Sequence, residues 1–438
     1  MSSRGVRVAC ALVALVLDVA VASDARPRRH WVGTWTASLA SPDGLGIAVS
    51  NRTIRQVAHT SIGGRRMRVR LANTFGTVPL RIDAVAVALV ADGARIPGTG
   101  RSVTFGGAPS ITIPQGARVV SDPVRLRVPA DGDVMVSFYV AGTTEPLNLH
   151  RFASATTYVS VPGDHVADPT MDAFWFPMSS FFVLDGVDVA APRHVRAVVA
   201  LGDSITDGVG STVDANRRYP DFLARRLRAR GRRMAVLDAG IGGNRILTDT
   251  GAAGVNALAR FDRDVLSQAG VRTVILLEGI NDIGFSEVPL DQCSICTEVS
   301  AEEMAAGYEQ LIAQAHRRGL RILGGTLLPF AGAFDYSART DAKRQAVNDW
   351  IRHRSSFDGV IDFDAVMGDP DDPLRLRPAY DSGDHLHPSD AGYEAMAAAI
   401  DLRCLERPRR RLRERTDCTR RVRRTADGRS APHTVSSD

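Results

Sequence analysis

Four short segments of the chain carry side chains that together could perform acyl transfer. A serine stands in GDSITDG (202–208), a glycine-rich turn in GIGGN (240–244), an asparagine in GIND (279–282), and an aspartate three residues before a histidine in DHLHP (384–388). Acyl transfer needs a nucleophile, a base that takes its proton, a group that orients the base, and hydrogen-bond donors for the oxyanion. The four segments supply a candidate for each part.

The elements that position these segments are the strands of one predicted sheet. From residue 194 onward, apolar runs of strand length alternate with helical patterns. The predicted strands are 195–201, 234–239, 272–278, 321–327 and 359–363, and the predicted helices lie near 217–230, 257–268, 301–318, 338–354 and 390–402. This alternation predicts a doubly wound parallel five-stranded sheet, in which sites form at the carboxyl ends of the strands. We therefore expect all four segments at one rim.

The four segments, taken in this order, resemble the sequence blocks of the GDSL-type SGNH hydrolases over roughly residues 195–402. The resemblance implies a flavodoxin-like catalytic domain at 194–402 with Ser204 as nucleophile, His387 as base and Asp384 as the group that orients it. It implies no cofactor and no metal ion. The sequence lacks a GxSxG nucleophile elbow.

The resemblance also implies an oxyanion hole built from the N–H groups of Ser204 and Gly243 and the side-chain amide of Asn281. A glycine suits this role because it has no side chain to block approach to its N–H group. Losing one such donor typically costs about 3 kcal/mol of transition-state stabilisation. A serine hydroxyl needs a base to accept its proton, and histidine can do so near neutral pH.

Each candidate also has an interpretation without catalysis. Ser204 could only cap the following helix, Asn281 could be a turn residue, and the glycines of GIGGN could serve turn geometry alone. His385 competes with His387 as base, but only His387 has the Asp-x-x-His spacing. A metallophosphoesterase is disfavoured because its Asp-x-His and Gly-Asn-His ligand sets are absent from the sequence.

Residues 31–185 follow a different rhythm, with short apolar or alternating runs broken by Gly, Pro, Asn and Asp. This spacing predicts an all-β sandwich domain at 30–190. Its WVGTWTAS and NRTIRQVAHTSIGG segments resemble the β-rich module that precedes this hydrolase domain in secreted bacterial relatives. The sandwich could cover one side of the site or bind a glycan, and its tryptophans could belong to either a binding face or the core: Trp31, Trp35 and Trp175.

The N-terminus has the pattern of an export signal. Arg4 and Arg7 precede an apolar run, and Ala20-Val21-Ala22 offers a small-residue cleavage site, so residues 1–22 are predicted to be a signal peptide. The run is too short for a membrane anchor. We expect a secreted protein without such an anchor, in which disulfides form by default. The four cysteines after the signal pair most naturally as 293–296 and 404–418, one of three possible connectivities.

Charge is unevenly distributed over the 438 residues. Residues 403–438 hold twelve arginines against five acidic residues, a net of +7 that leaves −2 for residues 1–402 out of the total of +5. A basic balance confined to a tail argues against a nucleic-acid partner. We expect residues 403–438 to form an Arg-rich disordered tail.

Together these features predict a secreted serine esterase whose substrate is a small-molecule or polysaccharide ester, with short acyl groups or acetylated glycans favoured. Segment 283–299 follows Asn281 directly and is hypothesised to form one wall of the substrate pocket. A function of another class stays open: a glycan-binding or adhesive two-domain protein with an inactive hydrolase fold. The sequence makes no prediction of the oligomeric state.

Overall fold

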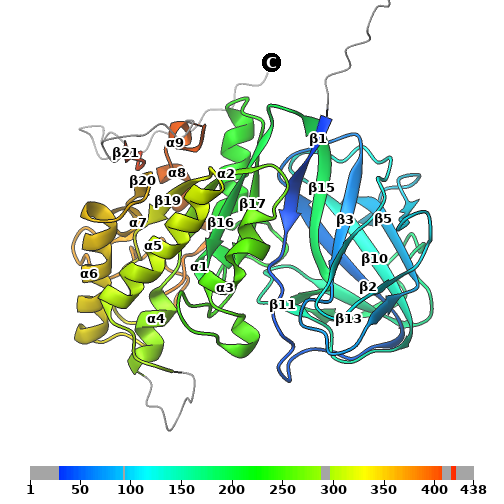
Figure 1. Ribbon diagram of the computed structural model, residues 1–438, viewed down its shortest axis with the longest axis horizontal. Helices are drawn as coiled ribbons and strands as arrows, with labels where there is room; N and C mark the ends of the chain where they lie inside the picture. The colour runs from blue at the N-terminus through cyan, green and yellow to red at the C-terminus, as the bar shows by residue number, and fades with distance from the viewer. Residues whose placement is uncertain (1–28, 92–93, 288–295, 407–415, 421–438) are drawn as a thin grey trace, which may run out of the picture.

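The computed structural model describes residues 29–91, 94–287, 296–406 and 416–420. They form a β-rich N-terminal domain and an α/β C-terminal domain that lie side by side (Figure 1). The predicted signal peptide, residues 1–22, lies outside the described residues. Within the described ranges, no helix combines the length and the apolar character needed to cross a membrane.

The N-terminal domain is the predicted β-sandwich. Its strands are β1 (Arg29–Thr36), β2 (Ser50–Thr60), β3 (Met67–Ala72), β4 (Leu80–Ile82), β5 (Ala84–Ala91), β6 (Ala94–Arg95), β7 (Arg101–Ser102), β8 (Ile111–Ile113), β9 (Arg118–Val120), β10 (Gly132–Thr143), β11 (Leu149–Arg151), β12 (Thr157–Pro162), β13 (Phe174–Met178), β14 (Ser180–Phe182) and β15 (Leu184–Pro192). One sheet has the order β1-β15-β3-β9 and the other β13-β12-β2-β10-β5-β6, with β7 on β5. Fully buried residues of both sheets, such as Val69 and Phe138, build one core between them.

The three tryptophans of this domain have different environments. Trp35 is buried and packs edge-on against Phe181 at 4.9 Å between ring centroids. The guanidinium of Arg68 lies 4.6 Å from the Trp31 ring centroid. Only Trp175, on β13, is largely exposed.

The C-terminal domain is built on five parallel strands, each of which overlaps its predicted range. They are β16 (Arg196–Gly202), β17 (Met234–Gly240), β18 (Val271–Leu277), β19 (Arg321–Gly325) and β20 (Gly359–Ile361). Their spatial order is β17-β16-β18-β19-β20, which is 2-1-3-4-5 in chain order and therefore flavodoxin-like. The order reverses between β16 and β18, and open α/β sheets bind ligands at that point.

The helices of this domain are α1 (Ser204–Asp207), α2 (Tyr219–Ala229), α3 (Ala257–Phe261), α4 (Ile280–Gly284), α5 (Ala301–Arg317), α6 (Ala338–His353), α7 (Phe363–Met367), α8 (Asp390–Ala399) and α9 (Leu402–Glu406). The helix predicted near 257–268 is α3 continued by a π-helical turn at Asp262–Leu266. Helix α2 packs against α8, and α5 packs against α3 and α6, which gives the helix layers of a wound sheet. Helices α1 and α4 were too short to be predicted, yet both begin at the carboxyl ends of the strands, where the sequence predicts the site.

The sheet has a sixth strand, and the prediction of disorder throughout 403–438 is wrong for part of that segment. Strand β21 (Thr416–Asp417) pairs in parallel with β20. The Cys404–Cys418 disulfide, predicted from the sequence, links α9 to the residue that directly follows β21. Both cysteines are buried. This cross-link and burial explain why 403–406 and 416–420 are folded despite their arginines. Residues 407–415, 421–438 and Cys293 lie outside the described residues, so the 293–296 pair stays a prediction.

The sandwich covers the β17 edge of the parallel sheet. Strand β1 lies against β17, and Gly33 lets the two approach because a Cβ there would be 2.8 Å from Leu237 Cδ1. The N–H groups of Gly33 and Val236 donate to the Ala269 carbonyl (2.9 Å) and to Ser61 Oγ (3.2 Å). Only three residues, 193–195, separate β15 from β16, so the connection between the two domains is short.

Candidate active site

Ser204 stands at the end of β16, as the first residue of α1. The extended residue Asp203 caps α1, because its Oδ1 accepts from the N–H of Ile205 at 2.9 Å. Gly202 allows the tight turn: a Cβ there would lie 2.1 Å from Thr206 Oγ1 and 2.2 Å from the Leu277 carbonyl. The end of β16 therefore places Ser204 where the strand order reverses, between β16 and β18.

The structure brings Ser204, His387 and Asp384 into one hydrogen-bonded chain. His387 Nε2 lies 2.8 Å from Ser204 Oγ, and His387 Nδ1 lies 2.6 Å from Asp384 Oδ2. Because an ionised carboxylate only accepts hydrogen bonds, it places the ring proton on Nδ1 and leaves Nε2 free to accept from the serine hydroxyl. This is the arrangement that a general base needs.

Asp384 stays ionised in this chain. Its Oδ1 accepts from the backbone N–H groups of Leu386 (3.0 Å) and His387 (2.8 Å). Partial burial works in the opposite direction, but the hydrogen bonds from the His387 ring and from these two amides lower the pKa of Asp384 well below its usual range. The carboxylate therefore keeps the orientation of His387 fixed.

His385 is turned away from the serine. Its Nδ1 pairs with Asp381 Oδ2 at 2.6 Å, and about half of its side chain is exposed. The Asp-x-x-His spacing thus identifies the histidine that contacts Ser204. His385, two residues earlier, lacks this spacing and pairs with Asp381 instead.

The turn after β17 carries the glycine predicted as an oxyanion donor. Gly243 has φ +81°, a left-handed conformation that favours glycine. The preceding residue is held in place, since Gly242 N–H donates to Asp207 Oδ2 at 3.1 Å. A Cβ at Gly240 would lie 2.2 Å from the Asp207 backbone nitrogen, so the glycine lets α1 and this turn approach closely.

The side chain of Asn281, on α4 just after β18, reaches the turn that follows β17. Its Nδ2 donates to the carbonyl of Asn244 at 2.9 Å. Only one of the two amide hydrogens can serve that bond, so the other is left to donate to a second acceptor. The next residue, Asp282, is buried and accepts from the backbone of Ile246 (2.8 Å) and Leu247 (3.3 Å), which fixes the far end of the turn.

A fully buried arginine supports the ends of the strands at this rim, and the sequence did not predict its role. Arg260 on α3 donates to the carbonyls of Ala239 (2.7 Å) and Gly202 (2.8 Å), at the ends of β17 and β16. It also donates to Asn244 Oδ1 (2.8 Å) and pairs with Glu278 Oε2 (3.3 Å), just beyond β18. Arg260 therefore joins the ends of three strands. Its position on the inner face of a predicted helix was the available signal.

Burial is the largest influence on the pKa values of the acidic side chains around Arg260. It raises the pKa of Asp203 to about 7 and that of Asp282 to about 6. It also raises the pKa of Glu278 well above its ordinary value, against the attraction of Arg260. Perturbed carboxyl groups of this kind gather at functional sites.

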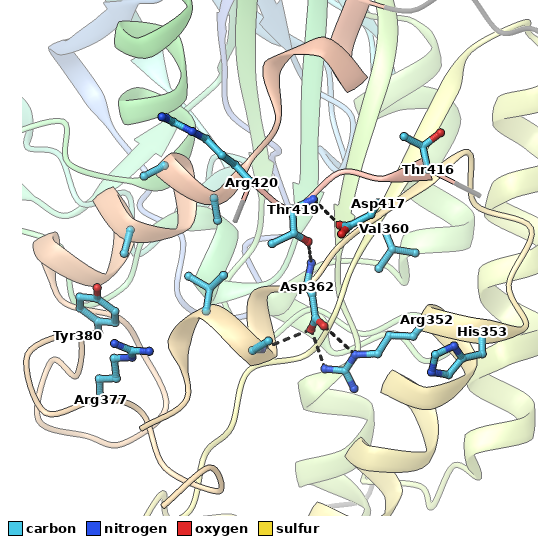
Figure 2. Close-up of a pocket in the computed structure, with 15 residues that line it drawn as sticks. Arg352, His353, Val360, Asp362, Arg377, Tyr380, Thr416, Asp417, Thr419 and Arg420 are labelled. Atoms are coloured by element: carbon cyan, nitrogen blue, oxygen red, sulfur yellow. Dashed lines mark hydrogen bonds and ion pairs between the residues drawn. The ribbon is translucent and has the colours of Figure 1, made fainter. Parts of the chain in front are cut away.

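A hollow of about 990 Å³ lies elsewhere in the domain, between α6, α8 and the β20–β21 edge (Figure 2). Its charged lining is already partly paired, since Arg352 donates to Asp362 at 2.6 and 3.0 Å. None of the predicted catalytic residues lines it. Within the described part of the chain, no cluster of three or more His, Cys, Asp or Glu side chains is arranged to hold a metal ion.

Comparison with known families identifies the domain that carries this rim. Residues 200–395 match the model of the GDSL-like Lipase/Acylhydrolase family. The C-terminal domain is a GDSL-like lipase/acylhydrolase domain. This makes the chain a carboxylic ester hydrolase, as the sequence predicted. The match begins within β16 and ends within α8. It therefore spans Ser204, Asn281, the Asp384–His387 pair and residues 240–244, the turn after β17 that holds the predicted oxyanion donor and is named the oxyanion turn.

Solved structures resemble the GDSL-like domain only distantly. A putative lipolytic protein of the G-D-S-L family from Desulfitobacterium hafniense is 21% identical, with 46% of this chain and 95% of that chain covered and a TM-score of 0.35. An acetylxylan esterase from Geobacillus stearothermophilus is 23% identical (48% and 94% covered, TM-score 0.36). A GDSL-like lipase from Bacteroides thetaiotaomicron is 20% identical (46% and 84% covered, TM-score 0.33). At these values none of the three bears on the activity. No curated protein sequence matches the chain.

Proposed function

We propose that the protein is a secreted serine esterase that hydrolyses carboxylic esters through an acyl-enzyme on Ser204. The observation that carries the proposal is the unbroken chain from Ser204 Oγ to His387 Nε2 (2.8 Å) and from His387 Nδ1 to Asp384 (2.6 Å). A buried serine at a strand end, hydrogen-bonded to a histidine that a carboxylate orients, is an activated nucleophile.

The first half of the reaction forms the acyl-enzyme. Ser204 Oγ attacks the ester carbonyl carbon while its proton passes to His387 Nε2. The negative charge that develops on the carbonyl oxygen is stabilised by the N–H groups of Ser204 and Gly243 and by the free amide hydrogen of Asn281. The C–O bond to the alcohol then breaks, and His387 returns the proton to the departing alkoxide.

The second half releases the acid. Water attacks the acyl carbon, its proton passes to His387, and the same donors stabilise the second oxyanion. The bond to Ser204 Oγ breaks, and the serine recovers its proton from His387. The imidazolium that forms in each half lies against the Asp384 carboxylate, which stabilises its positive charge.

Short acyl groups are the favoured substrates, because the sequence shows no long apolar segment of the kind that forms the lid of a lipase. The hypothesised wall at 283–299 is described only in part, because residues 288–295 lie outside the described residues.

The alcohol side of the ester meets an open rim, which supports an ester carried on a glycan. The Asp384 side chain is 50% exposed. Phe152 of the sandwich, 47% exposed, lies against the oxyanion turn: a Cβ at Gly242 would be 2.7 Å from its Cδ2. An exposed aromatic ring beside the oxyanion turn offers an apolar face to an alcohol or sugar.

A panel of esters tests the proposal. It contains short- and long-chain p-nitrophenyl esters and acetylated xylan, with Ser204→Ala as the control. Hydrolysis of the short esters that disappears in the variant is expected. A well-folded protein that turns over no ester in the panel favours the alternative, a glycan-binding or adhesive protein with an inactive hydrolase fold.

A further inference from the structure

The sandwich contributes the side chain of His150 to the rim that carries Ser204. His150 on β11 is 5% exposed, and its ring lies between two acceptors from different domains. Nδ1 lies 3.0 Å from the carbonyl of Ser38, in the sandwich, and Nε2 lies 2.9 Å from Asp207 Oδ1, in the hydrolase domain. Asp207 is the last residue of α1, three positions after Ser204.

Both ring nitrogens of His150 face oxygen atoms that accept hydrogen bonds. A carbonyl accepts only, so Nδ1 carries a proton, and a carboxylate attracts a second proton to Nε2. Burial opposes the charge, but Asp207 outweighs it and raises the pKa of His150 above its ordinary value. His150 and Asp207 thus form a buried, hydrogen-bonded pair across the domain boundary.

The other oxygen of Asp207 holds the oxyanion turn. Oδ2 accepts from the N–H of Gly242 at 3.1 Å, and the next N–H in the chain is that of Gly243. The direction of the Gly242 peptide is therefore tied, through one carboxylate, to the position of His150. Within the described residues, His150 is the one side chain that hydrogen-bonds to Asp207.

We propose that His150 is a positioning residue for ester hydrolysis, which orients the oxyanion donor Gly243 through Asp207 and Gly242. The inference rests on the proposed function of the site. It makes the sandwich part of the catalytic unit: the hydrolase domain supplies the reacting groups, and the sandwich fixes the geometry of one oxyanion donor. His150 does not touch the substrate.

Two substitutions separate the two bonds of His150. In His150→Gln the amide nitrogen occupies the place of Nε2 and still donates to Asp207. In His150→Asn the amide nitrogen occupies the place of Nδ1, donates to Ser38 and does not reach Asp207. Both variants are neutral and polar, so they differ mainly in the contact that the proposal requires.

A matched control exists at another point of the domain boundary. His59 contacts Asp133 (2.7 Å) and Asp131 (3.2 Å) in the sandwich. Asp131 in turn pairs with Arg228 of the hydrolase domain at 2.6 Å. His59→Gln therefore disturbs a histidine–carboxylate contact within the sandwich, at the domain boundary, that has no link to the oxyanion turn.

The experiment measures kcat and KM of the full chain for p-nitrophenyl acetate, the inhibition constant of a trifluoromethyl ketone, and the melting temperature. The ketone forms an oxyanion on Ser204, so its affinity reports the oxyanion hole. Because losing one donor costs about 10²–10³ in kcat, misplacing one in His150→Asn is expected to lower kcat by about tenfold or more. Its KM should stay within about twofold, and the ketone should bind correspondingly more weakly.

The conservative variant and the control complete the prediction. His150→Gln is expected to recover most of kcat, and His59→Gln to leave kcat and ketone binding unchanged. If His150 only stabilises the fold, its variants lower the melting temperature without this pattern in kcat and ketone binding. The proposal is overturned if folded His150→Asn keeps the wild-type kcat, or if the Gln and Asn variants are equally impaired.

Two further results keep the test decisive. If His150→Asn does not fold, Asp207→Ala removes the acceptor of Gly242 directly and must show the same fall in kcat at unchanged KM; wild-type kcat in that variant overturns the proposal. If the unmodified protein hydrolyses no ester, it is the proposed function that fails. Turnover that Ser204→Ala abolishes and His150→Asn leaves intact overturns only the role of His150.

Discussion

The side-chain amide of Asn281 donates to the main-chain oxygen of Asn244, at 2.9 Å, and so ties the loop after β18 to the turn after β17. One hydrogen of the amide serves this bond, and the other is free for the substrate. The amide is thus oriented before substrate arrives, which is the condition for strong oxyanion stabilisation.

Replacing this amide is expected to damage catalysis rather than binding. Asn281→Ala should lower kcat by about 10²–10³, corresponding to about 3–4 kcal/mol, with little change in KM. Steady-state kinetics on p-nitrophenyl acetate check this. Asn256→Ala, which removes a helix-capping side chain away from the oxyanion, serves as control. Equal kcat values for the Asn281 and Asn256 variants would contradict the assignment.

Arg260 is expected to be essential for the stability of the rim. Arg260→Met removes a buried cation and leaves Glu278 and two strand-end carbonyls without their donor. Each buried acceptor left without its donor costs about 1–3 kcal/mol, so we expect the free energy of unfolding to fall by several kcal/mol. Denaturant unfolding measures the loss. The exposed Arg228 is the matched comparison, because removing a surface ion pair costs only about 0–1 kcal/mol. Similar losses for both arginines would refute this role.

Because of the titration of Asp203, we expect the free energy of unfolding to decrease as the pH rises through the weakly acidic range. Burial raises the pKa of Asp203 to about 7, so between its ordinary value and about pH 7 the folded state binds more protons than the unfolded state. Stability declines with rising pH under this condition. Asp203→Asn keeps a side-chain oxygen to cap Ile205 and should make the decline shallower, with part left because of Glu278.

Melting temperatures between pH 4 and pH 7 test the role of Asp203. Glu302→Gln, which removes an exposed acid on α5, should leave the slope unchanged. An Asp203→Asn slope equal to that of the unmodified protein would show that the buried carboxyl does not titrate in this range.

Phe152 is expected to affect binding of the alcohol part of the ester. Its exposed ring lies against Gly242, so Phe152→Ala removes an apolar face without touching the serine or its base. KM for esters with an aromatic alcohol should rise several-fold while kcat changes little. Comparing p-nitrophenyl acetate with ethyl acetate gives the control, because the small alcohol offers the ring little surface. An equal change for both esters would contradict a contact with the alcohol.

The fold and the contact between His387 and Ser204 could be predicted from the sequence, because both rest on local patterns. Strand-length apolar runs alternating with helical periods placed β16–β20 within a few residues, and the Asp-x-x-His spacing singled out the histidine that meets Ser204. The Cys404–Cys418 pair followed from the small number of cysteines.

What escaped prediction depends on contacts between distant segments. Arg260 donates to carbonyls of strands that only the folded sheet brings together. Its position on the inner face of a predicted helix signals burial but does not identify these partners. His150 is separated by 57 positions from its partner Asp207 and lies in the other domain. The folded part of the tail was missed for a similar reason: charge predicted disorder, but the disulfide and pairing with β20 hold Thr416–Asp417 in the sheet.

The central claim, that Ser204 is the nucleophile, is tested most directly by covalent labelling. A fluorophosphonate reacts with an activated serine and stays bound, so peptide mapping by mass spectrometry identifies the residue. We predict stoichiometric label on Ser204, loss of ester hydrolysis in proportion to labelling, and neither labelling nor hydrolysis in Ser204→Ala. Label on another residue, or undiminished hydrolysis by Ser204→Ala, would contradict the account.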